Sequence, residues 1–206
     1  ARVILLKLSP MLDWHAAVHQ LDCVREVHIV ATGNECKELL LVCSSEQIGD
    51  GNVCCVNNGQ RFCFPMETTP NTGLKTSQEI HIEDFLYEPN AAVMKGGCFG
   101  MLCEKYKVVA LGHDSHLFTS PIMIDDFPGR RFRIKAVSSF NKKELNRNLS
   151  NIKQANIAVR HFPLSANELR KRLKLRDGGD TYLFATTFQP SSTSRQERIL
   201  MITEKA

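Results

Sequence analysis

Apolar and polar positions along the first 45 residues predict three strands and one helix. The chain opens on an apolar run at 3–6, which indicates a strand buried on both faces, as in a parallel sheet. A helical spacing of apolar residues then reaches Leu21, and the runs at 25–31 and 37–43 predict two strands joined by a Gly33-Asn34 turn. Because a parallel strand needs neighbours, we expect this chain to be the C-terminal fragment of a longer protein.

Short strands are predicted in the middle of the chain. Residues 52–65 hold two apolar runs around Asn57-Asn58-Gly59, which is a strong hairpin signal. Alternating apolar and polar residues at 80–86 predict another strand. Residues 107–111 predict a further strand, followed by a turn at Gly112 and a second short strand.

A helix is predicted to start at Pro89 or Asn90, between these strands. Its interior contains Gly96 and Gly97, and a glycine inside a helix costs about 1 kcal/mol relative to alanine. The two glycines allow either the close approach of a ligand or tight packing of the helix. Tight packing is the favoured interpretation.

From residue 132 the pattern becomes strand, helix, strand, helix, strand and strand. The strands are predicted at 132–137, 155–160, 181–188 and 198–203. The helices start at Asn141 and Ser165, each followed three positions later by a glutamate, which predicts a capping box. The pair Gly178-Gly179 is expected to end the second helix. This order predicts a compact α+β domain.

Positive charge is concentrated in this last domain. The chain has a net charge of +4, but residues 130–176 hold fourteen Lys and Arg against two acids, whereas the rest of the chain has a balance of −8. Both helices place leucines on one side and basic residues on the others, which fits either a solvated charged face or a surface that binds an anionic partner. Nucleic acid is the favoured partner, with a membrane surface second.

Nine cations are the candidates for contacting nucleic-acid phosphates. They are Lys142, Lys143, Arg147, Arg160, Arg170, Lys171, Arg172, Lys174 and Arg176. Phe162 is a candidate for stacking on an unpaired base, but the following Pro163 and Leu164 favour a packed side chain.

The eight cysteines all lie before residue 104, and no C-x-x-C pair occurs among them. Several lie in apolar runs, where a free thiol acts as a small core residue, so reduced buried thiols are expected. His113 and His116 flank Asp114, but this spacing on a strand or loop does not place both imidazoles on one face. We therefore predict no metal site.

Several familiar motifs are missing from the sequence. It contains no P-loop and no G-x-G-x-x-G, and the C-terminal domain shows no nucleophile with a base and an orienting group. No apolar run approaches the length of about 18 residues that a membrane span needs. Catalytic residues are therefore not assigned, and no membrane partner is expected.

Seven segments carry a family resemblance. They are LLKLSPMLD (5–13), VREVHIVATGNECKELLL (24–41), LYEPNAAVMKGGCF (86–99), HLFTS (116–120), DFPGRRFR (126–133), FNKKEL (140–145) and FPLSANELRKRLKLRDGGDTYLFAT (162–186). The chain resembles the C-terminal portion of bacterial class I S-adenosylmethionine-dependent methyltransferases of a type found largely in Bacteroidetes. These proteins have a ferredoxin-like middle domain and a C-terminal THUMP-like domain.

The resemblance implies a mixed α+β fold in three parts. Residues 1–45 would end a Rossmann-type methyltransferase sheet, residues 46–125 would form the ferredoxin-like domain, and residues 126–206 the THUMP-like, RNA-binding domain. The antiparallel last strand of a class I methyltransferase sheet agrees with the hairpin predicted at 25–43. The resemblance also implies a cytoplasmic methyltransferase that acts on RNA, with tRNA or rRNA as the expected substrate.

The cofactor-binding strands of that family are not present in this sequence. We therefore expect S-adenosylmethionine to be the cofactor of the full-length protein, with its site outside this chain, and we expect this chain to be inactive alone. Lys7, Ser9 and Asp13 follow the end of a sheet strand and are substrate-side candidates, with a strand end and helix cap as the favoured alternative. Two other functions stay open, a non-catalytic RNA-binding module and a protein-interaction scaffold.

Overall fold

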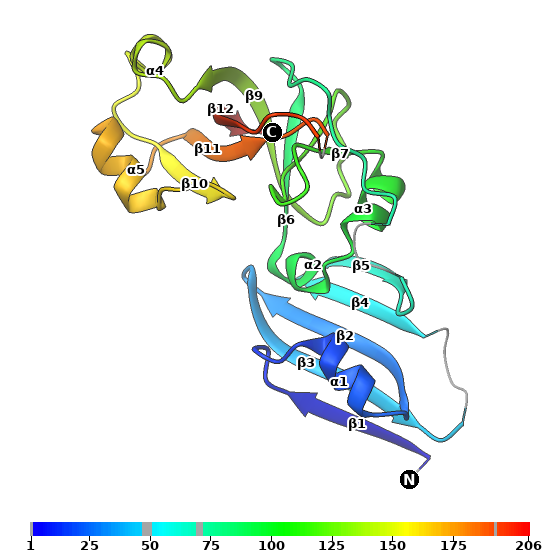
Figure 1. The fold of residues 1–206 in the computed structure, drawn as a ribbon. Helices are drawn as coiled ribbons and strands as arrows, with labels where there is room; N and C mark the ends of the chain where they lie inside the picture. Colours follow the sequence, from blue (N-terminus) through cyan, green and yellow to red (C-terminus); the bar gives the residue numbers. More distant parts are fainter. Residues whose placement is uncertain (1, 47–50, 69–71, 192) are drawn as a thin grey trace. The chain divides into compact units, whose positions relative to one another are not determined.

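The computed structural model describes residues 2–46, 51–68, 72–191 and 193–206 (Figure 1). The chain divides into two compact units. The first unit comprises residues 1–72 and 89–101, and the second comprises residues 73–88 and 102–206.

A five-stranded sheet forms the first unit. Its strands are β1 (Val3–Leu8), β2 (Val24–Thr32), β3 (Glu35–Ser44), β4 (Asn52–Asn57) and β5 (Gln60–Pro65), in the spatial order β1-β3-β2-β4-β5. Strand β3 is antiparallel to both β1 and β2, so β1 and β2 run in the same direction with β3 between them. This arrangement confirms the predicted hairpin and its antiparallel last strand. The β4–β5 hairpin continues the sheet across the domain boundary predicted at residue 45.

Strand β1 differs from its prediction. It lies at the sheet edge and pairs with β3 alone. Val3, Ile4 and Leu5 are 48%, 51% and 62% exposed, so the expected burial on both faces is wrong in the structure of this chain. Apolar side chains favour burial, but a strand is buried on both faces only where another element packs on each of them.

Two short helices cover one face of this sheet. They are α1 (Trp14–Gln20), with N-cap Asp13, and α2 (Ala91–Gly96), with N-cap Asn90. Trp14 of α1 is buried, and its indole lies against the Phe64 ring of β5 with 6.4 Å between ring centroids.

The two glycines of the predicted long helix have different roles. A Cβ on Gly96 would lie 2.6 Å from the Cys55 sulfur and 3.3 Å from Phe64, so this glycine lets α2 pack closely on β4 and β5. Gly97 has φ of +74° and ends α2, and a separate helix α3 (Phe99–Tyr106) follows. The interpretation of tight packing is thus confirmed for Gly96, while the single helix is replaced by two.

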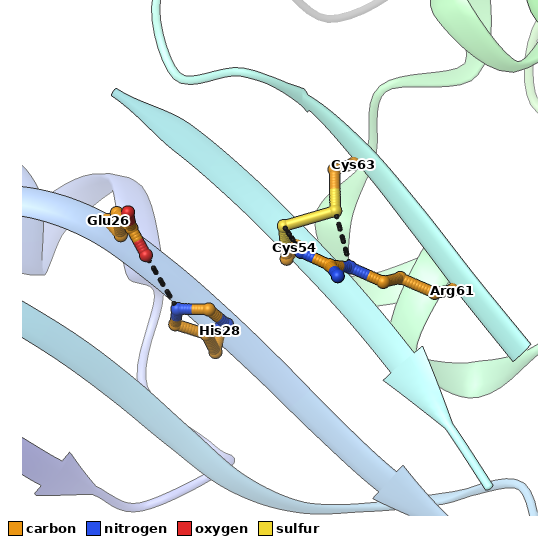
Figure 2. The surroundings of a disulfide bond; sticks show 5 residues. All are labelled: Glu26, His28, Cys54, Arg61 and Cys63. Carbon is orange, nitrogen blue, oxygen red and sulfur yellow. Dashed lines mark hydrogen bonds and ion pairs between the residues drawn. A yellow bond between two sulfur atoms is a disulfide. The ribbon is translucent and has the colours of Figure 1, made fainter. Parts of the chain in front are cut away.

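A disulfide joins Cys54 of β4 to Cys63 of β5 (Figure 2). The two residues are directly opposite in the antiparallel register, and their Cα atoms are 4.2 Å apart. The expectation that all eight thiols are reduced is therefore wrong for this pair. The sequence hides the pairing because it depends on the register of the hairpin. The other six cysteines are free.

A seven-stranded sheet forms most of the second unit. Its strands are β6 (Phe85–Pro89), β7 (Val109–Ala110), β8 (Phe118–Ser120), β9 (Gly129–Ser139), β10 (Asn156–Arg160), β11 (Thr181–Phe188) and β12 (Glu197–Lys205), in the order β10-β11-β12-β9-β6-β8-β7. Helices α4 (Lys142–Leu149) and α5 (Ala166–Leu173) follow β9 and β10. The predicted order of the C-terminal α+β domain is confirmed.

The strand predicted at 80–86 is displaced, because β6 begins only at Phe85. Glu83 adopts a left-handed conformation with φ of +75°, which interrupts an extended chain. Its carboxylate pairs with Arg133 and Lys135 of β9, each at 3.2 Å. The pairing with a distant strand is not visible in a local pattern.

Alternation along the strands gives the second unit two apolar cores. In β11, Phe184 contributes to one core, and Leu183 and Ala185 contribute to the other. The first core contains Leu86, Leu111, Leu117, Phe132, Ile134, Phe184, Ile199 and Met201. The second contains the helix leucines Leu145 and Leu169. Both faces of this part of the sheet are therefore covered.

Candidate nucleic-acid interface

Helices α4 and α5 start in closely similar ways. The Asn141 side chain accepts a hydrogen bond from the Glu144 amide at 2.9 Å, and the Ser165 hydroxyl accepts one from the Glu168 amide at 3.3 Å. Each glutamate also accepts hydrogen bonds in return. Glu168 closes the predicted capping box on Ser165, whereas Glu144 accepts from Ser139, two residues before the cap residue Asn141.

These hydrogen bonds favour the charged glutamates. The Ser139 hydroxyl and amide lower the pKa of Glu144, and those of Ser165 lower the pKa of Glu168. The carboxylates also sit in the first turn, where the positive end of the helix dipole stabilises an anion. Both acids of the basic segment are therefore used within the caps.

The leucines of both helices face the sheet. Leu145 and Leu169 are buried, and Leu149 and Leu173 pack against the same core. This burial fixes which sides of the helices meet solvent, and it leaves the basic residues on those outward sides.

Helix α5 ends earlier than the sequence predicts. Its C-cap is Lys174, with φ of +56°, and the Lys174 amide donates to the carbonyls of Arg170 and Lys171. The expectation that Gly178-Gly179 end the helix is wrong. Those glycines, with φ of +97° and +80°, lie instead in the turn that leads into β11. The helix stops early because Leu175 is buried in the core below it.

A groove of about 520 Å³ is lined by residues of α4, α5 and their C-terminal ends. Its lining residues are Lys142, Leu145, Asn146, Leu149, Ser150, Arg172, Leu173 and Lys174. Three cations therefore line one concave surface, together with an amide and a hydroxyl. We call this surface the basic groove.

The nine predicted cations fall into two groups. Seven are exposed on or beside the two helices, namely Lys142, Lys143, Arg147, Lys171, Arg172, Lys174 and Arg176. Within the described part of the chain, none of these seven forms an ion pair. The Arg172 guanidinium lies 4.8 Å from the centre of the Phe140 ring, and this contact orients the side chain.

The remaining two cations, Arg160 and Arg170, are held by carboxylates. Arg160 pairs at 2.7 Å with Glu88, which is only 2% exposed and also pairs with Arg130. Arg170 pairs with Asp177 at 2.5 Å. Sequence reasoning could not identify the Arg160–Glu88 pair, because the two residues are 72 positions apart. Both arginines are thus less available to an outside anion than the seven exposed cations.

A second, larger pocket of about 1070 Å³ lies where β9, β10 and β11 end. It is lined by Ser139, Phe140, Asn141, His161, Phe162, Pro163, Thr187, Arg195, Gln196, Glu197 and Arg198. Phe162 meets Phe140 edge to face at 5.0 Å and is half-buried, so the expected packing of Phe162 is confirmed.

Arg195 and Arg198 were missed by the sequence analysis. Arg195 lies in the polar loop between β11 and β12, and Arg198 lies in β12, so both fall outside the segment 130–176 whose charge was counted. Among the residues that the structure describes, neither forms an ion pair. A count of charge by position in the fold, rather than in the sequence, would have included them.

The three substrate-side candidates lie in the first unit. Lys7 of β1 pairs with Glu38 of β3 at 2.6 Å. The Ser9 hydroxyl accepts a hydrogen bond from the Met11 amide, and Asp13 caps α1 by accepting from the His15 amide. This hydrogen bond is the main cause of the lowered pKa of Asp13. All three side chains take part in local structural contacts.

No group of three or more histidine, cysteine or acidic side chains is placed to hold a metal, as far as the described residues go. Burial lowers the pKa of His116, which favours its neutral form. In the described parts of the chain, no helix is long and apolar enough to cross a membrane.

Comparisons with known proteins give two matching domain families and one similar structure. Residues 85–128 match a ferredoxin-like domain, and residues 129–205 match a THUMP domain-like family. A crystal structure of a "putative methyltransferase" from Porphyromonas gingivalis W83 is 32% identical to this chain, with a TM-score of 0.87. The similarity covers 99% of this chain and 51% of that one, so the chain spans about half the length of its relative. No curated protein sequence matches.

Proposed function

We propose that this chain binds RNA. The proposal is supported by its ferredoxin-like and THUMP-like domains and by its similarity to about half of a "putative methyltransferase". The THUMP-like domain binds the RNA substrate of a methyltransferase of which this chain is the C-terminal portion. The substrate is a structured cytoplasmic RNA, tRNA or rRNA. The observation that carries the proposal is the basic groove.

The basic groove supports phosphate binding through three features. Lys142, Arg172 and Lys174 converge on one concave surface. The two helices that bear them are capped at their start and anchored by buried leucines, so the cations project from rigid elements. Phosphate contacts position a protein on nucleic acid and need only such cations, without a code for bases.

The larger pocket at the end of the sheet supports contact with an unpaired part of the RNA. Arg195 and Arg198 can bind phosphates, while the side-chain amide of Gln196 lies in the same lining and can meet a base edge. The imidazole of His161 is exposed and can stack on a base. Sequence-tolerant stacking beside free arginines is typical of single-stranded nucleic-acid sites.

The substrate-side candidates among the described residues of the first unit do not form a site for S-adenosylmethionine, the methyl donor expected for the whole protein. At the carboxyl end of β1, Lys7 is paired with Glu38 and Asp13 caps a helix, so neither is available to a ribose or an amino acid group. These residues do not fit the cofactor. We therefore derive no step of methyl transfer for this chain.

Binding of fluorescently labelled tRNA by the 206-residue chain tests the proposal. In the variant K142E/R172E/K174E we expect an affinity loss on the order of 100-fold at about 0.1 M salt. The slope of log K against log salt should fall by about three, because each lost phosphate contact reduces it by about one. Anisotropy titrations at several salt concentrations measure both quantities.

The matched control is K7E/K37E, which reverses two exposed lysines of the first unit. It should leave RNA affinity within about twofold of wild type. Equal losses in both variants would show that only net charge matters and would contradict a defined interface. Absence of RNA binding by the wild-type chain would favour the protein-interaction scaffold. Competition by duplex DNA tests whether RNA is preferred.

A further inference from the structure

The face of the five-stranded sheet opposite to α1 and α2 carries a group of reactive side chains. In register, His28 of β2 lies directly beside Cys54 of β4, and Cys54 lies directly opposite Cys63 of β5. Neighbours in register share a face, so these three residues lie together. The opposite face holds Cys55, which packs against Gly96 of α2.

Arg61 connects the two sulfur atoms of the disulfide. Its Nε atom donates to the Cys63 sulfur at 3.2 Å, and one terminal nitrogen donates to the Cys54 sulfur at 3.5 Å (Figure 2). A guanidinium beside a sulfur stabilises the thiolate form. This one side chain is therefore placed to stabilise whichever sulfur leaves when the bond is broken.

A second pair of titratable groups stands next to the disulfide. The His28 Nε2 atom is 3.0 Å from a carboxylate oxygen of Glu26, and both side chains are partly exposed (Figure 2). The carboxylate orients the imidazole. Sulfur, guanidinium, imidazole and carboxylate thus share one open face.

The hairpin does not need the disulfide to keep its register. Six residue pairs, from Asn52–Pro65 to Asn57–Gln60, already align β4 with β5, and the bond closes a separation of only nine residues. A closed loop of this length gains less from a cross-link than a longer one, because less chain entropy is removed. The oxidised and reduced chains can therefore share one fold, and exchange does not require unfolding.

We propose that Cys54 and Cys63 form a thiol–disulfide exchange site for low-molecular-weight thiols. An external thiolate attacks the sulfur of Cys63, which is the more exposed of the two residues, and forms a mixed disulfide. The Cys54–Cys63 bond breaks, and its electron pair goes to the Cys54 sulfur beside Arg61. A second external thiolate then attacks the external sulfur of the mixed disulfide, and Cys63 leaves as a thiolate.

The net reaction converts two external thiols and the protein disulfide into one external disulfide and two protein thiols. The two external thiols release their protons to solvent, and solvent supplies the protons that Cys54 and Cys63 take up. The reverse reaction restores the bond. In a reducing compartment such bonds are usually transient, so the site reports the ratio of thiol to disulfide around it.

Two buried cysteines, Cys55 and Cys103, are expected not to take part in exchange. Burial raises the pKa of Cys55 to about 12 and that of Cys103 to about 11, so both remain thiols and react slowly. These two residues serve as internal controls within the same chain.

The test equilibrates the 206-residue chain with reduced and oxidised glutathione at different ratios. After an acid quench, alkylation and mass spectrometry give the reduced fraction of Cys54 and Cys63. We expect this fraction to follow the glutathione ratio without unfolding, while Cys55 and Cys103 stay unmodified. The variant Arg61→Gln should exchange about tenfold more slowly, and Lys37→Gln, an exposed lysine of β3, should exchange at the wild-type rate.

Three results would overturn the proposal. The bond could resist excess reduced glutathione until urea unfolds the chain, which is the behaviour of a structural disulfide. The pair could stay reduced at every ratio. Arg61→Gln could exchange as fast as wild type. If Arg61→Gln lowers the urea midpoint, Arg61→Lys takes its place, because it keeps the charge but cannot donate to both sulfurs from one planar group.

Discussion

The two sheets of this protein differ in how their faces are covered. In the second unit, one face meets α4 and α5, and the other meets Leu86, Leu111 and Leu117. In the first unit, α1 and α2 cover only the face that contains Cys55. The other face and the edge strand β1 keep apolar groups in contact with solvent, and Leu5 is 62% exposed.

The difference separates two kinds of surface. Where both faces are covered, the leucines of α4 and α5 turn inward and the cations turn outward, so a charged binding surface results. Where one face stays open, half-buried groups such as His28 and Cys63 remain within reach of solvent. The first surface suits a polyanion, and the second suits small reactants.

Removing the residues that cover one face of the seven-stranded sheet should cause the largest loss of stability. A chain of residues 129–206 would expose Phe132, Ile134, Phe184 and Met201, which are now fully buried. Burial of each such side chain contributes about 1.5–3 kcal/mol, so the loss for four of them exceeds the whole stability of a small domain, about 5 kcal/mol. We expect this fragment to bind a hydrophobic dye and to unfold without a cooperative transition.

The matched comparison is the fragment 73–206, which keeps the covering residues. It should unfold cooperatively in urea, as followed by far-ultraviolet circular dichroism. If residues 129–206 unfolded at the same urea concentration as 73–206, the THUMP-like domain would be independent of its neighbour. That result would contradict the view that the second unit depends on cover over both faces of its sheet.

Gly96→Ala tests the covered face of the five-stranded sheet. The new methyl group would lie 2.6 Å from the Cys55 sulfur, and overpacking of this kind costs about 1–3 kcal/mol. Trp14 fluorescence reports unfolding of this unit, because Trp14 is the single tryptophan and contacts Phe64. The double variant Gly96→Ala/Cys55→Ala should recover part of the loss. No recovery would show that the sulfur is not the clashing group.

Ser165→Ala tests the smaller contribution of a helix cap. Loss of an N-cap hydroxyl costs about 1 kcal/mol at neutral pH, measured as the urea midpoint by circular dichroism. The pKa of Glu168 is lowered from 4.5 chiefly by its hydrogen bond to this serine. Its stabilisation is therefore present above pH 4.5 and is lost as the pH falls through the lowered pKa.

The difference in urea midpoint between wild type and Ser165→Ala should therefore be smaller at pH 3 than at neutral pH. Asn141→Ala at the start of α4 is the parallel case, because the pKa of Glu144 is lowered mainly by the hydroxyl and amide of Ser139 and to a smaller extent by the Asn141 side chain. The loss of stability caused by Asn141→Ala should therefore depend less on pH than the loss caused by Ser165→Ala. An equal change in both variants would mean that the two caps do not differ as their hydrogen bonds indicate.

Local features of the fold were predictable from the sequence. The helix starts at Asn141 and Ser165 were predicted correctly, and Asn90 is one of the two starts predicted for α2, because a cap involves residues only three positions apart. The antiparallel β2–β3 hairpin follows from a short turn between two apolar runs. The end of α5 at Lys174 was not predictable, since it depends on where Leu175 packs.

Long-range partners could not be predicted in the same way. The Arg160–Glu88 pair and the Cys54–Cys63 bond depend on sheet register, which a single sequence does not specify. The basic character of α4 and α5 was visible as charge density. The groove required the structure, because it arises from how two helices dock on one sheet.

The position of β3 between β1 and β2 also constrains the order of folding. The β2–β3 hairpin closes through a two-residue turn, a local step that takes microseconds in peptides. Strand β1 must find β3 across most of the unit, since Val3 pairs with Ser44, and this closure is entropically slower. Because β1 and β2 touch only through β3, the hairpin is the template and β1 adds to it afterwards.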